Sequence, residues 1–132
     1  MNEHQLSRKI VEHVRKEFGP NAVVFKLNDR ITRGIPDIAV TRGGKTTWLE
    51  VKLFSCAEPS ESELKKKLDK VQRHELTRLR DAGRAFYVMG YYEDKNVRLV
   101  VVAPENADKF GAYRFGRSNT LNDDLRMLLT FL

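Results

Sequence analysis

Two short segments with alternating polar and apolar side chains, joined by a pair of glycines, constrain the fold of this chain most strongly. The segments cover residues 35–41 and 46–53, and both are expected to be β-strands because a period of two is typical of a strand with one buried face. Gly43 and Gly44 between them are a strong signal for a tight turn. The sequence therefore predicts a β-hairpin.

A two-residue turn at these glycines fixes which residues face each other across the hairpin. Asp37 then lies directly opposite Glu50, and Lys52 points to the same face as Glu50 because side chains alternate along a strand. A slip of two in the pairing keeps both carboxylates on one face, whereas a slip of one separates them unless a bulge intervenes. One face of the hairpin is thus expected to carry two acids and a lysine.

Two carboxylates at this spacing suggest a bound cation. The Cβ atoms of a cross-strand pair lie about 4.5–5.5 Å apart, where two like charges repel each other and destabilise the sheet. A cation between them removes the repulsion, and oxygen ligands with negative charge suit Mg²⁺ or Mn²⁺. The alternative is a solvated outer face with ordinary charges. The opposite face is expected to be core, since its residues are all apolar: Ile38, Val40, Leu49, Val51 and Leu53.

The other elements follow from helical periodicity, turn residues and capping signals. We expect helices at 3–18 and 61–82, the second closed by Gly83, and a last helix capped by Ser118 or Asn119. Strands are expected at 22–27, 85–91 and 97–103, and loops at 28–34 and 104–117.

The resulting order of elements, α-β-β-β-α-β-β-α, predicts an α/β protein with a mixed β-sheet flanked by helices rather than a regular βαβ repeat. The 132 residues are expected to form one domain. Its motif-bearing core would cover about 3–103, and 104–132 would be a C-terminal extension.

The charge of the chain narrows the class of partner. Its net charge of +6 and pI of about 9.6 favour a polyanion, chiefly nucleic acid or an anionic membrane. No apolar run approaches the roughly 18 residues that would span a bilayer, and the charged N-terminus does not resemble a signal peptide. Cys56 is the one cysteine, so no internal disulfide can form. We therefore expect a cytoplasmic, intracellular protein without a membrane partner. A bacterial or phage origin is a separate expectation that does not follow from composition.

Two motifs in the hairpin resemble the signature of the PD-(D/E)xK nucleases. They are Pro36-Asp37 and Glu50-Val51-Lys52. More closely, the ordered segments RGIPDIAV, WLEVKL and VQRHELTRLRDAG resemble the VRR-NUC family, over roughly residues 3–89. The resemblance implies a restriction-endonuclease-like fold and metal-dependent hydrolysis of phosphodiester bonds.

The resemblance also implies roles for the hairpin residues. Asp37 and Glu50 would bind Mg²⁺ or Mn²⁺, and the backbone carbonyl of Val51 would add a ligand. Lys52 would orient or activate the attacking water and counter the charge of the phosphate. Whether one or two metal ions bind stays open.

Gln72 would support this site from the second helix, and its position gives separate support for that role. Leu64, Leu68, Gln72 and Leu76 follow one another at helical spacing. A polar side chain in an apolar stripe needs a partner, because an unpaired buried amide costs about 1–3 kcal/mol. That partner would be either the site or the backbone.

The family also places a glutamate on the first helix. We choose Glu3, which shares a stripe with Leu6 and Ile10 and can face the sheet, and keep Glu12 as the alternative. The usual glutamate would fall close to Gln5, which is not acidic. Glu3 could equally be an ordinary surface charge.

These residues predict a metal-dependent endodeoxyribonuclease that is selective for DNA structure, such as a Holliday-junction resolvase, and acts in recombination or repair. Arg30, Arg33, Lys65 and Arg73 are candidate DNA-binding residues. A homodimer would present two sites to a branched DNA, with the C-terminal helix as its interface, unless that helix covers the sheet of its own chain. The alternatives are a sequence-specific restriction-type endonuclease and a non-catalytic nucleic-acid-binding module.

Overall fold

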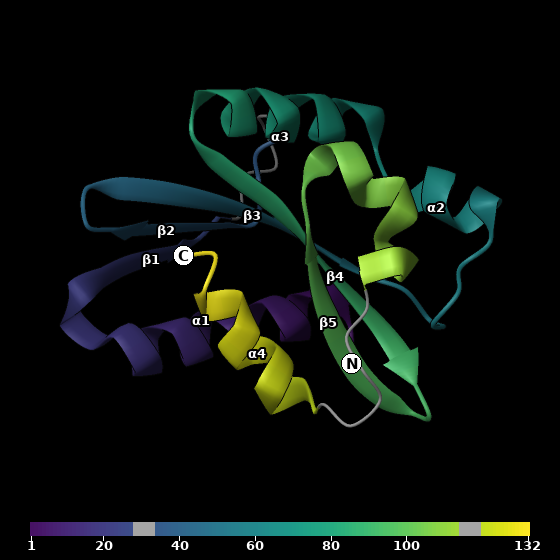
Figure 1. The fold of residues 1–132 in the computed structure, drawn as a ribbon, viewed down its shortest axis with the longest axis horizontal. Coiled ribbons are helices and arrows are strands. Elements are labelled where there is room, and N and C mark those ends of the chain that lie inside the picture. Colours follow the sequence, from purple (N-terminus) through teal and green to yellow (C-terminus); the bar gives the residue numbers. More distant parts are fainter. Residues whose placement is uncertain (28–33, 114–119) are drawn as a thin grey trace.

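The computed structural model describes residues 1–27, 34–113 and 120–132, which build a five-stranded sheet (Figure 1). The strands are β1 (Ala22–Lys26), β2 (Ile38–Arg42), β3 (Lys45–Leu53), β4 (Arg84–Glu93) and β5 (Asn96–Val102). They lie side by side in chain order, with β3 and β4 parallel and the other neighbours antiparallel. The expected mixed sheet of an α/β protein is therefore confirmed.

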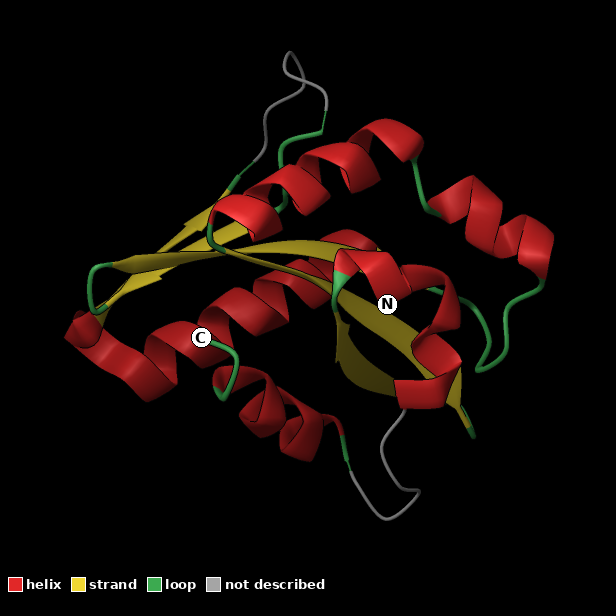
Figure 2. Cartoon of the chain, turned by 45° about the horizontal axis from the view of Figure 1, so that its top comes forward, coloured by secondary structure: helices red, strands yellow, loops and turns green. Residues whose placement is uncertain are grey.

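Helices cover both faces of this sheet. They are α1 (Glu3–Phe18), α2 (Glu61–Lys67), α3 (Lys70–Ala82) and α4 (Leu121–Leu129), with the short 3-10 helices η1 (Gly19–Asn21) and η2 (Pro104–Tyr113). α1 and α4 lie against one face, and α3 lies across the other with η2 (Figure 2). α2 and α3 form the crossover that two parallel neighbours such as β3 and β4 require. None of the helices in the described ranges is long and apolar enough to cross a membrane.

The hairpin between β2 and β3 has the register that a two-residue turn imposes. Gly43 and Gly44 both take positive φ, 59° and 76°, which glycine adopts without steric cost. Continued by one residue, this register sets Asp37 opposite Glu50, as predicted. The expected start of the first strand at residue 35 is wrong. The strand begins after Asp37, because Pro36 has no N–H to donate to a ladder.

The predicted core face of the hairpin is buried under α1 and α4. This cluster contains all five apolar hairpin residues together with residues of both helices: Ile38, Val40, Leu49, Val51, Leu53, Leu6, Ile10, Leu125 and Leu128. The apolar side of α4 therefore packs against the sheet of its own chain. Of the two uses considered for the C-terminal helix, the structure shows that it covers the sheet.

The opposite face of the sheet is also covered, so its interpretation as a solvated outer face is wrong. α3 and η2 pack on it through a second apolar cluster that includes Leu76, Tyr87, Met89 and Phe110. Next to this cluster the side chain of Glu50 is only 2% exposed and that of Lys52 only 9%. The charged pair of the hairpin therefore lies in a largely desolvated environment.

The prediction of a single helix at 61–82 is also wrong, because two helices occupy this stretch. α2 ends at Lys67, and α3 begins after Asp69. The carboxylate Oδ1 of Asp69 accepts hydrogen bonds from the backbone N–H groups of Val71 (2.8 Å) and Gln72 (3.2 Å). An aspartate that caps the following turn competes with continuation of a helix. The apolar stripe through Gln72 is therefore interrupted, and only its second half lies on α3.

The segment expected as a loop at 104–117 is largely regular. Its first ten residues form η2, with a kink at Lys109. The cap of the last helix is Thr120, whose side chain accepts a hydrogen bond from the N–H of Asp123. Ser118 and Asn119, the expected caps, lie outside the described residues. Tertiary contacts of η2 with the sheet, which sequence periodicity does not report, explain why this segment is ordered.

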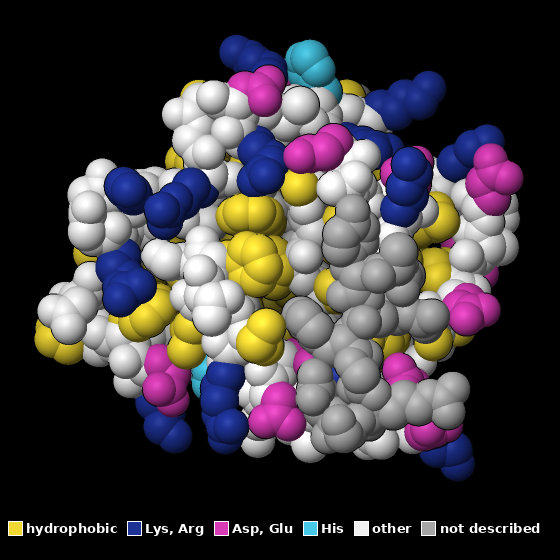
Figure 3. Space-filling view, in the orientation of Figure 1, with side chains coloured by type: hydrophobic (Ala, Val, Ile, Leu, Met, Phe, Trp, Pro, Cys, Tyr) yellow, Lys and Arg dark blue, Asp and Glu magenta, His cyan; other side chains and the backbone are white. Residues whose placement is uncertain are grey.

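Basic side chains are spread over the visible face of the molecule. In the space-filling view, Lys and Arg lie over α3 at the top and around the rim, whereas hydrophobic side chains gather near the middle (Figure 3). Acidic side chains lie among the basic ones. Where the described residues are visible on this face, the basic side chains are therefore interrupted by acidic and hydrophobic ones.

Candidate active site

Asp37 is fixed between the ends of two strands. Its carboxylate Oδ2 accepts a hydrogen bond of 2.8 Å from the backbone N–H of Val51 on β3. Its backbone carbonyl accepts another, of 2.7 Å, from the N–H of Leu27, just after β1. Asp37 is half-buried and lines a pocket through which a ligand can reach it.

Glu50 lies beside Asp37 and is the most perturbed acid of the site. Burial raises the pKa of Glu50 from its ordinary value of 4.5 to about 10, helped by a hydrogen bond to Asp37 and by the negative charge of Asp37. The positive charge of Lys52 opposes this shift. At neutral pH the carboxyl group of Glu50 therefore keeps its proton unless a cation takes its place.

Lys52 and Gln72 form the second half of the site. The ammonium Nζ of Lys52 donates a 2.7 Å hydrogen bond to the amide oxygen Oε1 of Gln72. This contact joins β3 to α3, and Gln72 is in turn placed by the capping contact from Asp69. Of the two partners considered for Gln72, the structure shows the lysine of the site rather than the backbone. Lys52 is thereby held on the face that carries Glu50.

One pocket of about 410 Å³ brings the predicted residues together. The predicted residues in its lining are Glu3, Asp37, Glu50, Val51, Lys52 and Gln72. The residues in its lining that sequence reasoning missed are His4, Ser7, Lys26 and Leu27. Two signals could have found some of them: Ser7 lies four residues after Glu3 on the same side of α1, and Lys26 ends the strand that pairs with β2. His4 and Lys26 contact each other, with 2.8 Å between Nδ1 and Nζ.

The structure brings Glu3, and not Glu12, to this pocket. The carboxylate Oε1 of Glu3 accepts a hydrogen bond from the N–H of Leu53 (3.1 Å) and lies 3.2 Å from the ammonium of Lys67. Its negative charge contributes to the raised pKa of Glu50. Glu12 is exposed and does not line the pocket. Glu3 therefore lies near the carboxyl pair of Asp37 and Glu50. Its own carboxylate, however, already contacts the backbone of β3 and the side chain of Lys67 on α2.

Of the expected DNA-binding residues, the two that the structure describes, Lys65 and Arg73, do not line the pocket. Arg30 and Arg33 lie outside the described residues. Lys65 is exposed and pairs with Glu61 at 3.4 Å, one turn back on α2. Arg73 turns toward η2, where its Nε donates a 3.1 Å hydrogen bond to the carbonyl of Pro104. Among the described residues, the cations of the pocket lining are instead Lys26 and Lys52.

The residues present fit a hard divalent cation. Two adjacent carboxyl groups, one of them buried with a strongly raised pKa, supply oxygen donors that a cation would keep ionised. Mg²⁺ is often held by one or two carboxylates while water completes its coordination. Within the described parts of the chain, no cluster of three or more His, Cys, Asp or Glu side chains could hold a metal ion. The fit therefore rests on Asp37 and Glu50 as a pair.

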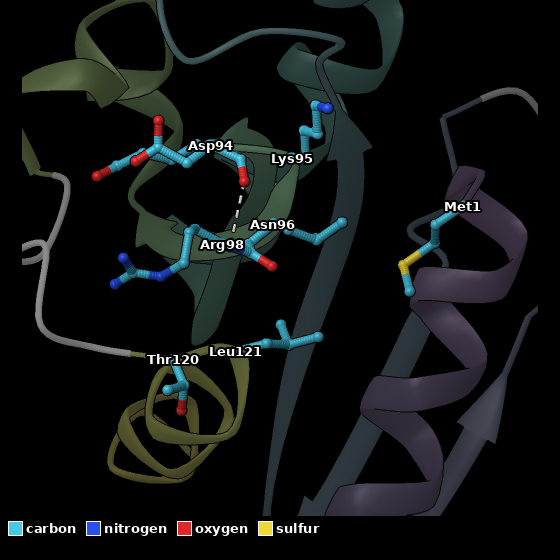
Figure 4. A pocket seen from close by; sticks show the side chains of 9 residues that line it. Met1, Asp94, Lys95, Asn96, Arg98, Thr120 and Leu121 are labelled. Carbon is cyan, nitrogen blue, oxygen red and sulfur yellow. Dashed lines mark hydrogen bonds between the residues drawn. The ribbon is translucent and has the colours of Figure 1, made fainter.

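A second pocket, of about 420 Å³, lies between the β4–β5 turn and the start of α4 (Figure 4). Its side chains include Asp94, Asn96, Arg98 and Thr120, and the amide of Asn96 donates to the backbone carbonyl of Asp94. Its acids are Glu93, which is half-buried, and Asp94, which is exposed, whereas Glu50 of the first pocket is buried. The buried carboxyl group of Glu50, with its raised pKa, beside Asp37 distinguishes the first pocket as the candidate active site.

We expect Glu50→Gln to stabilise the metal-free protein at neutral and alkaline pH. Because the folded pKa is raised, the folded state binds more protons than the unfolded state between pH 4.5 and about 10. The free energy of unfolding of the wild type should therefore fall as pH rises through that window, whereas Glu50→Gln, whose amide can donate to Asp37, should lack this fall. Urea denaturation from pH 5 to 9 in EDTA measures it. Glu17→Gln, an exposed acid of α1, serves as control, and parallel profiles for Glu50→Gln and wild type would contradict the assignment.

The site combines a carboxyl pair, a lysine held by an amide, and a pocket open to solvent. Such groups can hold a cation, bind an anionic group beside it and place a positive charge where negative charge develops. No protein-family model matches the chain, and no curated protein is significantly similar to it. A functional assignment therefore depends on this geometry and on the sequence pattern.

Proposed function

We propose that this protein is a metal-dependent DNA endonuclease with a restriction-endonuclease-like fold, as its resemblance to the VRR-NUC family implies. One observation carries the proposal. The buried carboxyl of Glu50 lies beside Asp37, and the hydrogen-bonded pair of Lys52 and Gln72 lines the same pocket. A buried carboxyl group and a nearly buried ammonium group would be costly to retain in a face that served only for packing.

Each of the main residues of the candidate active site has a role in this proposal. Asp37 and Glu50, with the backbone carbonyl of Val51, would hold Mg²⁺ or Mn²⁺. A bound cation supplies a Lewis acid that polarises the phosphate and acidifies water. Lys52, oriented by Gln72, would donate a charged hydrogen bond to the phosphate and stabilise the negative charge that develops on it. Lys26, which lines the same pocket, adds a second positive charge to it.

The proposed substrate is branched or junction DNA, cleaved by a homodimer in recombination or repair. A basic chain without a base-reading motif favours recognition of backbone and shape over sequence. Two sites related by a two-fold axis match the symmetry of a four-way junction. Because α4 packs on its own sheet, the dimer interface would lie elsewhere on the surface.

We expect the protein to cleave four-way junctions or flaps faster than plain duplex, in Mg²⁺ or Mn²⁺ and not in EDTA. The test compares these DNA structures at equal concentration, each with one labelled strand, and sedimentation of the junction complex gives the number of protein chains bound. If all DNA structures are cleaved at equal rates and always at one fixed sequence, the protein is a sequence-specific, restriction-type endonuclease and not a structure-selective one. Absence of cleavage of every DNA in both metals would overturn the nuclease assignment.

A second candidate is a non-catalytic nucleic-acid-binding module. It is favoured by the engagement of Glu3 with Leu53 and Lys67, which leaves two carboxyl groups rather than three for a metal among the described residues. The same assay separates the two functions. A module of this kind would bind the labelled DNA with unchanged affinity in EDTA and leave it intact in both metals.

A further inference from the structure

A larger pocket of about 600 Å³ adjoins the candidate active site. Three residues line both pockets: Glu3, Lys52 and Gln72. Beyond this shared wall, the larger pocket is formed by the start of α3, by α2 and by the segment after β3, including Lys66, Lys67 and Ser55. The two pockets therefore adjoin along one side of the sheet, with Lys52 between them.

Lys67 stands at the boundary between the two pockets. Its ammonium lies 3.2 Å from the carboxylate of Glu3 and 6.0 Å from the ring centre of Phe54. Phe54 is buried and stacks on Phe110 at 5.0 Å, so this ring is a fixed support for the lysine. The position of Lys67 is thus set by contacts from α1 and from the end of β3.

Lys67 can leave Glu3 for another anion at little cost in free energy. The side chains are 37% and 41% exposed, and an ion pair at such exposure contributes only about 0–1 kcal/mol. Glu3 would keep its hydrogen bond from the backbone of Leu53 after losing the lysine. A phosphate oxygen would offer Lys67 a charged hydrogen bond of at least equal strength.

The remaining charges of this pocket leave it favourable to an anion. Its other acids, Glu63 and Asp69, both accept hydrogen bonds from N–H groups at the starts of α2 and α3. Positive helix ends offset part of such charge. Lys66 is exposed and makes no ion pair or hydrogen bond that the described residues show. Among the described residues of this pocket, Lys66 therefore offers a positive charge directly, and Lys67 offers a second one once it leaves Glu3.

We propose that this adjoining pocket binds the phosphate next to the scissile phosphate on the same DNA strand, and that Lys67 contacts it. The inference rests on the proposed function, because it takes the candidate active site as the place of the scissile phosphate. Lys52 faces the scissile phosphate, and Lys67, released from Glu3, holds its neighbour. The strand thus crosses the shared wall of the two pockets, and Glu3 positions Lys67 before DNA arrives.

The first test measures binding without cleavage. In EDTA, fluorescence anisotropy with a labelled duplex gives the dissociation constant of wild type, Lys67→Gln and Lys67→Arg at several salt concentrations. We expect Lys67→Gln to weaken binding several-fold and to make the slope of log K against log salt shallower by about 0.9, which corresponds to one lost phosphate contact. Lys67→Arg should restore both.

The control is Lys16→Gln, which removes an equal exposed charge near the other end of α1, about 20 Å along the helix from Glu3. It should keep the wild-type slope. Equal melting temperatures of all variants show that folding is intact. A Lys67→Gln slope equal to that of Lys16→Gln would overturn the proposal.

The second test uses cleavage to locate the contact. A methylphosphonate, which lacks the phosphate charge, replaces the phosphate on each side of the scissile one in turn. At one of these positions it should slow the wild type and leave Lys67→Gln unaffected, since that contact is already lost. Equal slowing of both proteins at both positions would overturn the proposal while the nuclease function stands. If the wild type cleaves nothing, the proposed function fails, and the salt slopes still decide whether Lys67 contacts DNA.

Discussion

Replacing Asp37 by Asn should lower Mg²⁺-dependent cleavage of DNA by about a hundred- to a thousandfold while DNA binding persists. The amide oxygen can still accept the hydrogen bond from Val51, so the hairpin keeps its geometry and only the charge that holds the cation is lost. Lys52→Met should have an effect of similar size, because it removes the charge that faces the phosphate; removal of one such donor costs about 10²–10³ in rate. Single-turnover cleavage and anisotropy on the same DNA measure the two properties separately.

The matched control for the lysine is Lys45→Met, which changes an exposed residue at the start of the same strand. It should leave the rate of cleavage unchanged. Thermal melting must show that Asp37→Asn and Lys52→Met are folded, since both positions are partly or fully buried. Wild-type rates for both folded variants would remove Asp37 and Lys52 from the catalytic centre.

The hairpin could be predicted in detail because its determinants are local. Two adjacent glycines set the turn, and the alternation on either side sets the faces, so the pairing of Asp37 with Glu50 followed by counting. The point where β2 begins was missed by three residues, although Pro36 carried the signal. Turn chemistry and side-chain period act over a few residues and can be read from the chain directly.

The desolvation of the charged face could not be predicted, because distant segments cause it. α3 and η2 close over the face of Glu50 through Leu76 and Phe110, which lie far along the chain from the hairpin. The break between α2 and α3 has a local signal in Asp69, but it competes with a strong helical pattern on both sides. The burial of Glu50, and hence its raised pKa, is a tertiary effect.

Residues that reach the site only through tertiary packing could likewise not be predicted from the sequence. Gln72 was found because it follows the motif, yet its contact with Lys52 depends on how α3 crosses the sheet. His4 and Lys26 belong to no motif and meet at the pocket only because α1 packs against β1. Glu3 reaches the pocket for the same reason, and its ties to Leu53 and Lys67 have no counterpart in the sequence pattern.

A buried ion pair on the other side of the molecule connects the C-terminal helix to the sheet. Arg98 on β5 and Asp124 on α4 are 3% and 2% exposed. Nε and Nη2 of the arginine donate to the two carboxylate oxygens at 2.8 and 3.1 Å, and the N–H of Leu99 donates to the same carboxylate at 2.9 Å. The hydrogen bond to Asp124 holds the pKa of Arg98 above its usual value. This contact fixes α4 over the core that supports the hairpin.

Asp124→Ala should destabilise the protein by about 3 kcal/mol, because it removes the carboxylate to which a buried guanidinium group and a buried N–H both donate. The pocket beside Arg98 admits water, which holds the cost at the lower end of the usual range of about 3–5 kcal/mol. Urea denaturation measures this loss of stability directly, and we expect the melting temperature to fall by about 10 °C. Arg126→Met, which breaks the exposed pair with Asp123 on the same helix, should cost less than about 1 kcal/mol. Equal losses for both variants would mean that the buried pair does not anchor α4, whereas partial recovery in Arg98→Met/Asp124→Leu would confirm that the penalty comes from the unpaired charge.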